Sequence, residues 1–412
     1  MVVLTCFYPY ISHTFVQREV AGLRQRGVEV HTVSVRDPGP RHVLSAADRE
    51  SSVTTVNLIP APPRHLLRIH ARSFLLHPRA YVDTLLAAVR EAQPTVRGRV
   101  WQVFYFGEAV LLWRLCQQRR VRHVHVHFAN NAADIARIVT RLGNATDRQP
   151  WSWSLTMHGP TEFAEVSHFN LPEKVRSATF VACISDFCRS QLMALVEEEH
   201  WQKLGIVHCG VDLQRFRRAD SPRAEGPLRV LCLGRLVSQK GQALLVQAVA
   251  RLTRAGRQME VVLVGDGPRR PELERLVATE GLGKFVTFAG AVGQDEILEH
   301  LSWADVFVLP SFAEGVPVAL MEAMACELPV VTTRIAGIGE LVTHQESGLL
   351  VAPGRMDQLA DAIALLDDEP ELRAAMGKAG RAAVQQHYNA AITPEPLVEL
   401  LRTWAPAAAV AH

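Results

Sequence analysis

The chain has 412 residues, of which 48% are hydrophobic and 21% charged, and its formal net charge is +2. This composition is typical of a globular protein long enough for two hydrophobic cores. No run of about 18 uncharged apolar residues occurs, so no membrane-spanning helix is expected.

The amino-terminal residues and the cysteines indicate in which cellular compartment the protein is expected. The chain starts with a short apolar strand that has neither a basic leader nor a small-residue cleavage site, so we expect no signal peptide. The seven cysteines are scattered, without a Cys-x-x-Cys pair. An odd, unclustered set favours reduced thiols in a cytoplasm over disulfides or zinc.

Charge is distributed unevenly along the chain. Residues 1–205 carry 24 Lys and Arg against 17 Asp and Glu, a net +7, whereas the rest carry 20 against 25, a net −5. Eleven arginines lie between Arg64 and Arg122, interleaved with aromatic and aliphatic residues. This mixture suits binding to an anionic membrane surface. It equally suits ordinary amphipathic helices whose arginines face solvent and whose apolar residues pack in the core. Nucleic acid is disfavoured, because no recognition motif accompanies the charge.

The first half of the chain alternates strand and helix signals. Helices are expected at Phe15–Arg26 and from Asp186 onwards. Strands are expected at Val2–Phe7, Val28–Val35, His123–Phe128, Trp151–Met157, Thr179–Ile184 and Ile206–Cys209.

A second alternation follows a polar stretch rich in Pro and Gly. Its expected strands are Leu228–Leu233, Met259–Val264, Val286–Phe288, Val306–Leu309, Val330–Thr332 and Gly348–Val351. Repeated strand–helix units predict parallel sheets, and two such runs predict an α/β protein with two Rossmann-like domains facing a central cleft. We place these domains at residues 1–215 and 228–385, with a linker at 216–227. A helix and tail at 386–412 are expected to cross back to the first domain.

The first strand of the second half runs into Gly234 and then into Arg235 and Lys240. A glycine at a strand exit lets backbone approach a ligand, and the following helix N-terminus favours anions. Arg235 offers a planar fork of donors and Lys240 a mobile point charge, which together suit a diphosphate. Loop Arg and Lys residues are also commonly just solvated.

Two further loops carry glycines at strand exits. Gly265 and Gly267 follow the strand that ends at Val264, a pattern found in tight turns as often as in ligand loops. Gly290-Ala-Val292-Gly follows the next strand and could expose backbone to a nucleobase.

Glu314 and Glu322 lie eight residues apart around a Gly and a Pro. Glu314 is expected on a strand-to-helix loop, where α/β folds bind ligands, and Glu322 about two turns into the helix. In the alternative interpretation Glu314 is a first-turn acid that complements the helix dipole, and Glu322 lies on a solvated face.

In order and spacing, these motifs resemble the family-4 retaining glycosyltransferases of the GT-B fold. The resemblance covers the second half nearly end to end, from Gly234-Arg-Leu to Gly348-Leu-Leu-Val. It implies that Arg235 and Lys240 hold the diphosphate of a nucleotide-sugar donor, that Glu314 contacts the transferred sugar, and that Glu322 accepts hydrogen bonds from the ribose. The remaining donor-side residues that it implies are Gly234, Gly265, Gly267, Val292, Gly315, Val316 and Pro317.

The first half is similar to a subgroup that builds bacterial exopolysaccharides of the colanic-acid type. The matching motifs include Pro9-Tyr-Ile-Ser12-His-Thr-Phe15, His125-Val-His127-Phe-Ala and Met157-His158-Gly. The resemblance implies that His158 contacts the donor sugar and is catalytic with Arg235, Lys240 and Glu314. His13 replaces a frequent Glu, and Glu162 follows one residue later than the usual acid. The acceptor-side candidates are Ser12, His13, Thr14, His127 and Glu162.

His123, His125 and His127 alternate on one strand face, a pattern that metal ligands also show. We expect no carboxylate nearby to complete them, so we favour structural packing or cleft lining. Because Asp-x-Asp is also absent, we expect no metal and no cofactor, with a UDP- or GDP-sugar as co-substrate.

The resemblance implies transfer of a hexose, with retention, to a saccharide or lipid-linked saccharide in exopolysaccharide or cell-surface glycan synthesis. Expected partners are the donor, the acceptor and an anionic membrane through the Arg64–Arg122 region, in a cytoplasmic or peripheral membrane protein. Two alternatives remain: a nucleotide-sugar epimerase of the same fold, and a non-catalytic nucleotide-sugar-binding partner of a polysaccharide assembly complex.

Overall fold

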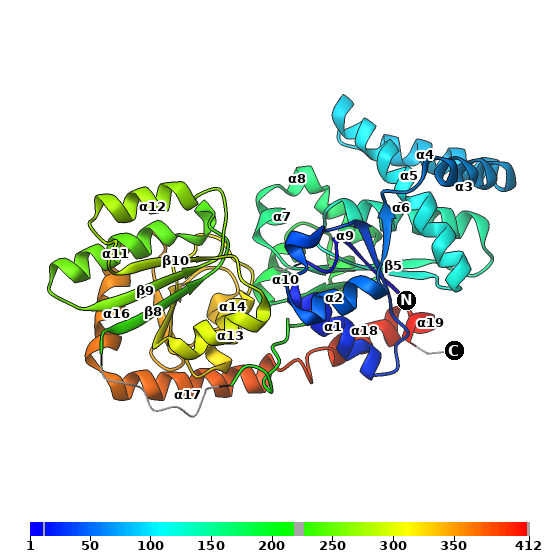
Figure 1. Ribbon diagram of the computed structural model, residues 1–412. Coiled ribbons are helices and arrows are strands. Elements are labelled where there is room, and N and C mark those ends of the chain that lie inside the picture. The colour runs from blue at the N-terminus through cyan, green and yellow to red at the C-terminus, as the bar shows by residue number, and fades with distance from the viewer. Residues whose placement is uncertain (11–12, 218–225, 410–412) are drawn as a thin grey trace. The chain divides into compact units, whose positions relative to one another are not determined.

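The computed structural model describes residues 1–10, 13–217 and 226–409, and the chain forms two compact units (Figure 1). Unit 1 comprises Met1–His208 together with Thr393–His412, and unit 2 comprises Cys209–Ile392. The borders thus follow residues 208 and 392, where the sequence suggested 215 and 385. Most of the expected linker lies outside the described residues. Each unit is an α/β layer structure with one parallel sheet, which confirms the predicted fold class.

Unit 1 is built on a seven-stranded sheet with the order β3-β2-β1-β4-β5-β6-β7, in which all pairs are parallel. Strands feeding right-handed crossovers leave helices on both faces of such a sheet. The strands are β1 Val2–Phe7, β2 His31–Arg36, β3 Val56–Ile59, β4 His123–His127, β5 Ser152–Met157, β6 Val181–Cys183 and β7 Leu204–Ile206.

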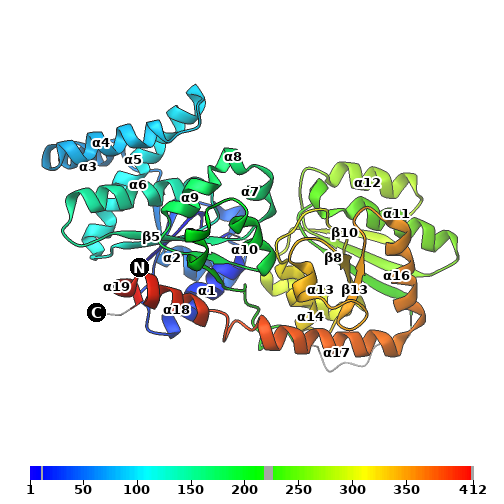
Figure 2. The ribbon, with the colours of Figure 1, turned by 180° about the vertical axis from the view of Figure 1, so that it is seen from behind.

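The helices of unit 1 cover both faces of its sheet (Figure 2). The longer ones are α1 Thr14–Gln25, α2 Ala46–Thr54, α3 Pro63–Leu76, α4 Pro78–Arg90, α5 Val96–Arg119, α6 Asn131–Thr146, α10 Asp186–Met193 and α18 Glu395–Trp404. The shorter ones are α7 Pro160–Ala164, α8 Val166–Phe169, α9 Leu171–Ser177, α19 Pro406–Ala409 and the 3-10 turns η1 Pro40–His42 and η2 Glu198–Lys203.

The core of unit 1 joins the two ends of the chain. Val16, Val20 and Leu23 of α1 are fully or nearly fully buried, and they share one cluster with Leu397 and Leu401 of α18. Burial of such side chains contributes roughly 1.5–3 kcal/mol each, so α18 is an integral part of this unit.

Several strands of unit 1 differ from the sequence prediction. β6 covers Val181–Cys183 where Thr179–Ile184 was expected, and β7 covers Leu204–Ile206 where Ile206–Cys209 was expected. β2 begins at His31 instead of Val28, because the amide of Val28 is taken by the carbonyl of Leu23 at the end of α1. β3, four residues at the sheet edge before Pro60, was missed because so short a run gives little periodicity.

Unit 2 has a six-stranded parallel sheet with the order β10-β9-β8-β11-β12-β13. Its strands are β8 Leu228–Leu233, β9 Met259–Val264, β10 Val286–Gly290, β11 Val306–Leu309, β12 Val330–Thr333 and β13 Gly348–Val351. Its helices are η3 Ser238–Lys240, α11 Gln242–Arg254, α12 Arg270–Thr279, α13 Gln294–Trp303, α14 Val318–Ala325, α15 Ile338–Leu341, α16 Met356–Asp368 and α17 Pro370–His387. The aliphatic strand residues are buried against α11 and α16, which fixes the sheet and leaves its strand ends to carry polar loops.

Helices α3, α4 and α5 form an arm at one edge of unit 1 (Figures 1 and 2). Eleven of the eighteen large hydrophobic side chains that are exposed among the described residues lie on this arm. They are Leu67, Phe74, Leu75, Leu76, Val82, Leu86, Val96, Val100, Trp101, Val103 and Phe104. Within the described ranges, no helix is long and apolar enough to cross a membrane.

Candidate active site

The strand order of unit 2 reverses between β8 and β11. From β8 the chain proceeds outward to β9 and β10, and from β11 it proceeds the other way to β12 and β13. In open α/β sheets, ligands bind beyond the carboxyl ends of the strands at such a switch point. The loops at this point are Gly234–Gly241 after β8 and Pro310–Pro317 after β11, which hold most of the donor-side candidates.

Two glycines let these loops approach closely. Gly241 has a φ of +65°, and a Cβ there would lie 2.0 Å from the carbonyl oxygen of Pro310. Gly265 has a φ of +133°, and a Cβ there would lie 2.1 Å from the carbonyl oxygen of Gly234. Side chains are therefore excluded where the loops after β8, β9 and β11 meet.

Lys240 and Glu314 form an ion pair across the switch point. The Lys240 Nζ lies 2.6 Å from Glu314 Oε1, and the Ser311 hydroxyl donates to the same oxygen at 2.6 Å. Glu314 is 7% exposed. A carboxylate in so little water requires these donors, so each of the two charged side chains holds the other in place.

Arg235 differs from Lys240 in being exposed, and its guanidinium forms no ion pair with another described residue. Its backbone is fixed, because the Gln242 side chain donates to its carbonyl oxygen at 2.9 Å. The loop thus presents Arg235 to solvent from a fixed main chain.

The other donor-side candidates surround this loop or open α14. Gly234 donates its amide to Val264, and Gly265 donates its amide to Gly290. Gly267 packs its backbone on Leu236, so closely that a Cβ would lie 2.4 Å from the Leu236 carbonyl oxygen. Val292 and Val316 are buried, and Gly315 and Pro317 lead into α14.

The alternative interpretation of the glutamate pair, with Glu314 in the first turn of the helix and Glu322 on a solvated face, is wrong for both residues. Glu314 lies four positions before Val318, where α14 begins, and no acidic residue occupies the first turn of that helix. Glu322 is 3% exposed, so it does not lie on a solvated face. A carboxylate is seldom buried to this degree unless it has polar partners.

Unit 1 has its own switch point, between β1 and β4. A cavity of about 420 Å³ opens there, lined by strand-end and loop residues. The lining residues are Cys6, Phe7, His13, Arg36, Phe128, Asn130 and Asn131.

Of the acceptor-side candidates, His13 lines this cavity and Thr14, 7% exposed, begins α1. The buried Nδ1 of His13 has no hydrogen-bond partner among the described residues. Burial, with the nearby His127 as a smaller cause, lowers the pKa of His13 to about 4. Ser12 lies outside the described residues.

His127 and His158 are in direct contact. His127 Nδ1 lies 2.9 Å from His158 Nε2, and both rings are buried. Phe15 and Phe128 pack against the His158 ring with centroids at 4.5 and 4.7 Å. Burial, followed by the neighbouring histidines, holds the pKa of His158 well below 6.5, so this imidazole is neutral.

The expectation that no carboxylate lies near the histidines of β4 is wrong. Oε1 of Glu19, from α1, lies 3.1 Å from His127 Nε2 and 3.6 Å from His125 Nε2. These three residues are of the types that ligate metals, and their ligand atoms lie within 4.8 Å of one another. His125, however, already has Ser154 and Thr156 within hydrogen-bond distance of its two ring nitrogens.

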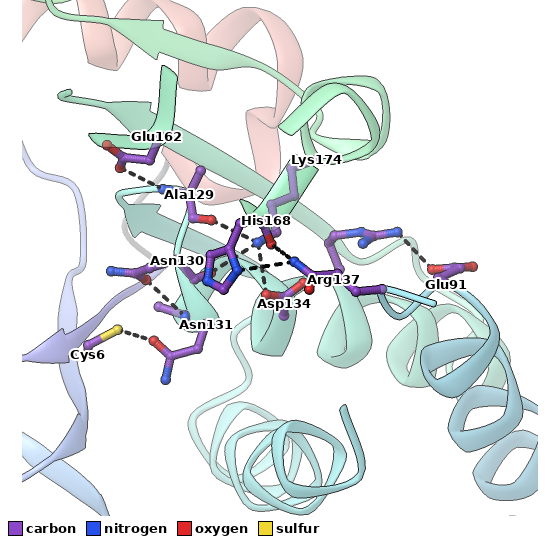
Figure 3. A network of polar contacts seen from close by, with 12 residues as sticks. Cys6, Glu91, Ala129, Asn130, Asn131, Asp134, Arg137, Glu162, His168 and Lys174 are labelled. Atoms are coloured by element: carbon purple, nitrogen blue, oxygen red, sulfur yellow. Dashed lines mark hydrogen bonds and ion pairs between the residues drawn. The ribbon is translucent and has the colours of Figure 1, made fainter. Parts of the chain in front are cut away.

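Glu162 braces the loop that follows β4. Its buried carboxylate accepts the amide of Ala129 at 3.3 Å, and burial raises its pKa. On the other side of the same loop, the Lys174 ammonium donates to the Ala129 carbonyl at 2.8 Å and to Asp134 at 2.8 Å (Figure 3). These contacts fix the main chain directly after His127.

Sequence reasoning did not assign Glu19, Ser311 or Arg36 a role in these groups. Arg36 ends β2 and Ser311 follows β11, so their places at strand ends were a usable signal. Glu19 follows the buried Val16 by three positions, a spacing that puts it towards the apolar face of α1. No local pattern could name His127 as its partner.

Two Rossmann-like units with charged side chains at the switch point of the second are the architecture of the GT-B class. Residues 214–383 match the family model "Glycosyl transferases group 1". This part of the chain is therefore a group 1 glycosyltransferase domain, as the resemblance of the motifs implied.

Curated relatives support this assignment. The chain is 28% identical to alpha-D-kanosaminyltransferase of Streptomyces kanamyceticus over 72% of its own length and 84% of the relative. It is 34% identical to the putative colanic acid biosynthesis glycosyltransferase WcaL of Escherichia coli K12, over 49% of this chain and 51% of that one. A mannosyltransferase acting on phosphatidylinositol monomannoside, from Mycobacterium tuberculosis, is 36% identical over 54% of this chain and 61% of its own. The chain thus spans only about half to three-fifths of the last two relatives.

Solved structures show the same fold. Sucrose-phosphate synthase from Thermosynechococcus elongatus matches 98% of this chain and 99% of its own, with a TM-score of 0.73 and 21% identity. HepE from Anabaena in complex with UDP-glucose matches 98% and 100%, with a TM-score of 0.72 and 17% identity.

Proposed function

We propose that this protein is a retaining hexosyltransferase that uses a nucleoside-diphosphate sugar and an acceptor that is a saccharide or a lipid-linked saccharide. The observation that carries the proposal is the Lys240–Glu314 pair at the switch point of a group 1 glycosyltransferase domain. A role in exopolysaccharide or cell-surface glycan synthesis is supported by the similarity to the putative colanic acid biosynthesis glycosyltransferase WcaL.

Unit 2 supplies the donor site in this proposal. Arg235 and Lys240 bind the diphosphate, Glu314 contacts the transferred sugar, and Glu322 accepts from the ribose hydroxyls. The UDP and UDP-glucose complexes of HepE, a protein of the same fold, support a nucleotide-sugar ligand. The backbone N–H groups of Gly315 and Val316, directly before Pro317 and α14, are available to phosphate and sugar.

The chemical step is carried mainly by positive charge. The acceptor hydroxyl oxygen forms the new bond to the sugar C1 while the bond from C1 to the diphosphate oxygen breaks. The acceptor attacks the face of the sugar from which the diphosphate departs, so the configuration is retained without an enzyme nucleophile. The hydroxyl proton passes to the departing diphosphate. The leaving group gains negative charge as the bond breaks, and fixed cations that stabilise it lower the barrier. Arg235 and Lys240 supply that charge, and we propose that no divalent ion or other cofactor is required.

Unit 1 supplies His158 and the acceptor site. His158 acts on the transferred sugar as a neutral imidazole, and the cavity lined by His13, Arg36 and Phe128 receives the acceptor. The Arg36 guanidinium forms only a weak ion pair, because the carboxylate oxygen of Glu108 lies 3.9 Å from it. An acceptor with an anionic group would find a partner there.

We also propose that the arm formed by α3, α4 and α5 docks on the anionic inner face of the cell membrane. Its apolar side chains are exposed and not core faces, which speaks against the alternative of ordinary amphipathic helices. Exposed arginines accompany them, including Arg68, Arg72, Arg97 and Arg99. Arg114 and Arg122 are less suited to this role, since they bond to Ser73 and Asp147 within the protein.

The deciding experiment is a screen of nucleotide sugars without added metal. UDP-glucose, UDP-galactose, UDP-N-acetylglucosamine and GDP-mannose are tested for thermal stabilisation and slow hydrolysis. A donor present at a hundred times its Kd should stabilise the protein by about 2.7 kcal/mol. Acceptor-dependent release of nucleoside diphosphate then supports transfer. Interconversion of sugars without an acceptor would indicate the epimerase, and binding without turnover would indicate a non-catalytic partner.

A further inference from the structure

Glu19, His127 and His158 form a continuous chain of polar contacts in unit 1. Oε1 of Glu19 lies 3.1 Å from His127 Nε2, and His127 Nδ1 lies 2.9 Å from His158 Nε2. The three groups come from α1, β4 and the loop after β5. Both rings are at least nine-tenths buried, and the side chain of Glu19 is 13% exposed.

The order of donors and acceptors along this chain follows from its first member. An ionised carboxylate can only accept, so the proton facing Glu19 resides on His127 Nε2. In a neutral His127 the Nδ1 is then an acceptor, and His158 must donate to it from Nε2. Glu19 thereby determines the tautomer of a side chain that it does not touch.

The charge states of the residues agree with this order. Burial alone would raise the pKa of Glu19, but the charge and hydrogen bond of His127 and the charge of His125 outweigh it and lower the pKa. His158, His125 and His13 all have lowered pKa values, mainly through burial, and are therefore neutral near pH 7. The cluster thus pairs the Glu19 carboxylate with His127, while the rings of His158, His125 and His13 around them are neutral.

The contact between Glu19 and His127 is the part of this chain of contacts that a mutation can remove while both histidines remain in place. Both His127 Nε2 and Glu19 Oε1 are buried, and neither forms a regular hydrogen bond with a described residue, so their 3.1 Å approach is the main polar contact of both atoms. Separating two buried polar atoms that have so few other partners is costly. Removal of Glu19 would therefore leave His127 free to change its tautomer or its ring orientation.

We propose that Glu19 and His127 are positioning residues that hold the His158 imidazole in one orientation and one tautomer. The inference rests on the catalytic role proposed above for His158 and adds to it the two residues that prepare that ring. A metal ion bound by Glu19, His125 and His127 is the competing explanation. It is disfavoured because both nitrogens of His125 are engaged by Ser154 and Thr156.

The first test is a double-mutant cycle on the full-length protein. The variants are Glu19→Ala, His127→Phe, His158→Ala and the two doubles with His158→Ala. The readout is hydrolysis of whichever of UDP-glucose, UDP-galactose or GDP-mannose the wild type cleaves fastest. Each single variant should lose about tenfold to a hundredfold in kcat, because a small misplacement of a reacting group has effects of this size. Glu19→Ala and His127→Phe should cost nothing further once His158 is absent.

His123→Phe is the matched control. His123 lies on the same face of β4 and is bonded to Ser152 and Ser154, but it does not belong to the chain of contacts that ends at His158. Its effect should be additive with that of His158→Ala. Additive behaviour of Glu19→Ala or His127→Phe as well would overturn the proposal.

The second test needs no activity. In ¹⁵N spectra of histidine-labelled protein, the wild-type His158 should be a single tautomer protonated on Nε2, and Glu19→Ala should shift or split its signals. Unchanged His158 signals would overturn the proposal. So would a stoichiometric metal in the purified wild type that disappears in Glu19→Ala.

The two possible failures can be distinguished. An active His158→Ala variant removes His158 from the proposed function, and with it any catalytic effect of the positioning residues. If His158→Ala is nearly inactive but the double variants show additive losses, the catalytic role of His158 stands and only its coupling to Glu19 and His127 is overturned.

Discussion

Lys240 Nζ and Glu314 Oε1 lie 2.6 Å apart although 74 residues separate them in the chain. The contact bridges the loops after β8 and β11, the two strands between which the order of the sheet reverses. It joins a residue expected to bind diphosphate to one expected to bind sugar. A ligand that inserts a phosphate here would have to share the ammonium with the glutamate.

Lys240→Ala should reduce donor turnover by about a hundredfold or more, because a fixed cation is lost where the leaving group gains charge. The melting temperature should also fall, since the buried Glu314 then keeps, of its two donors among the described residues, the Ser311 hydroxyl. Steady-state kinetics with the donor found in the screen, together with thermal unfolding, measure both effects. Lys284→Ala, at an exposed site of the same unit, is the control. A near-normal rate in Lys240→Ala would remove this residue from the donor site.

Glu322→Ala should lose most of the transfer activity while the protein remains folded, because a charged acceptor for the ribose hydroxyls is gone. The sharper readout uses inhibitors. In the wild type, the 2′-deoxynucleoside diphosphate should inhibit more weakly than its ribose counterpart. In Glu322→Ala the two inhibition constants should converge. If the wild-type ratio persists in the variant, Glu322 does not contact the ribose.

Binding to vesicles should depend on the arm. Replacing both Arg97 and Arg99 by Ala should weaken binding to vesicles of phosphatidylcholine and phosphatidylglycerol, measured by sedimentation, by about thirtyfold, since each arginine near an anionic surface contributes about 1 kcal/mol. Added salt should weaken wild-type binding in the same way. Arg251→Ala with Arg254→Ala, at exposed positions on α11, gives a matched change in charge. Equal loss in both pairs, or binding to purely neutral vesicles, would contradict the docking proposal.

Stability should decline in mild acid because of the buried histidines. Burial, partly offset by Glu19, lowers the pKa of His125 to about 3 from its ordinary value of 6.5. Between about pH 6.5 and pH 3 the unfolded chain takes up a proton at this position that the folded protein does not. As the pH decreases through this range, the free energy of unfolding should therefore decrease by about 1.4 kcal/mol per pH unit for this one group.

Urea unfolding at pH 7, 6 and 5 measures this slope. His125→Gln should reduce the slope of the free energy of unfolding against pH by about 1.4 kcal/mol per unit, the contribution of one proton. This reduction is expected whatever the effect of the substitution on stability at pH 7. The exposed His65→Gln should leave the slope as it is. An unchanged slope in His125→Gln would mean that another group takes up the proton.

The sequence determined the elements and the kind of chemistry at their ends. Apolar runs such as Leu228–Leu233 and Val306–Leu309 identify buried strands by themselves, and the residues that follow a parallel strand must lie at its ligand-binding end. For this reason Gly234, Lys240 and Glu314 could be chosen as site candidates from their positions taken together with the resemblance of the motifs to a known family. The short edge strand β3 was missed, since four residues carry too little pattern.

Only the tertiary structure decided which side chains pair. That Glu322 is buried, that Lys240 meets Glu314, and that Arg114 is tied to Ser73 while Arg97 is exposed depend on strand order and helix packing. Glu19 is the clearest case. Its helix is adjacent to β1 in the sequence, but its carboxylate reaches β4 because β4 pairs with β1 in the sheet. Local propensities act over a few residues, whereas a charge selects its partner by distance in the folded chain.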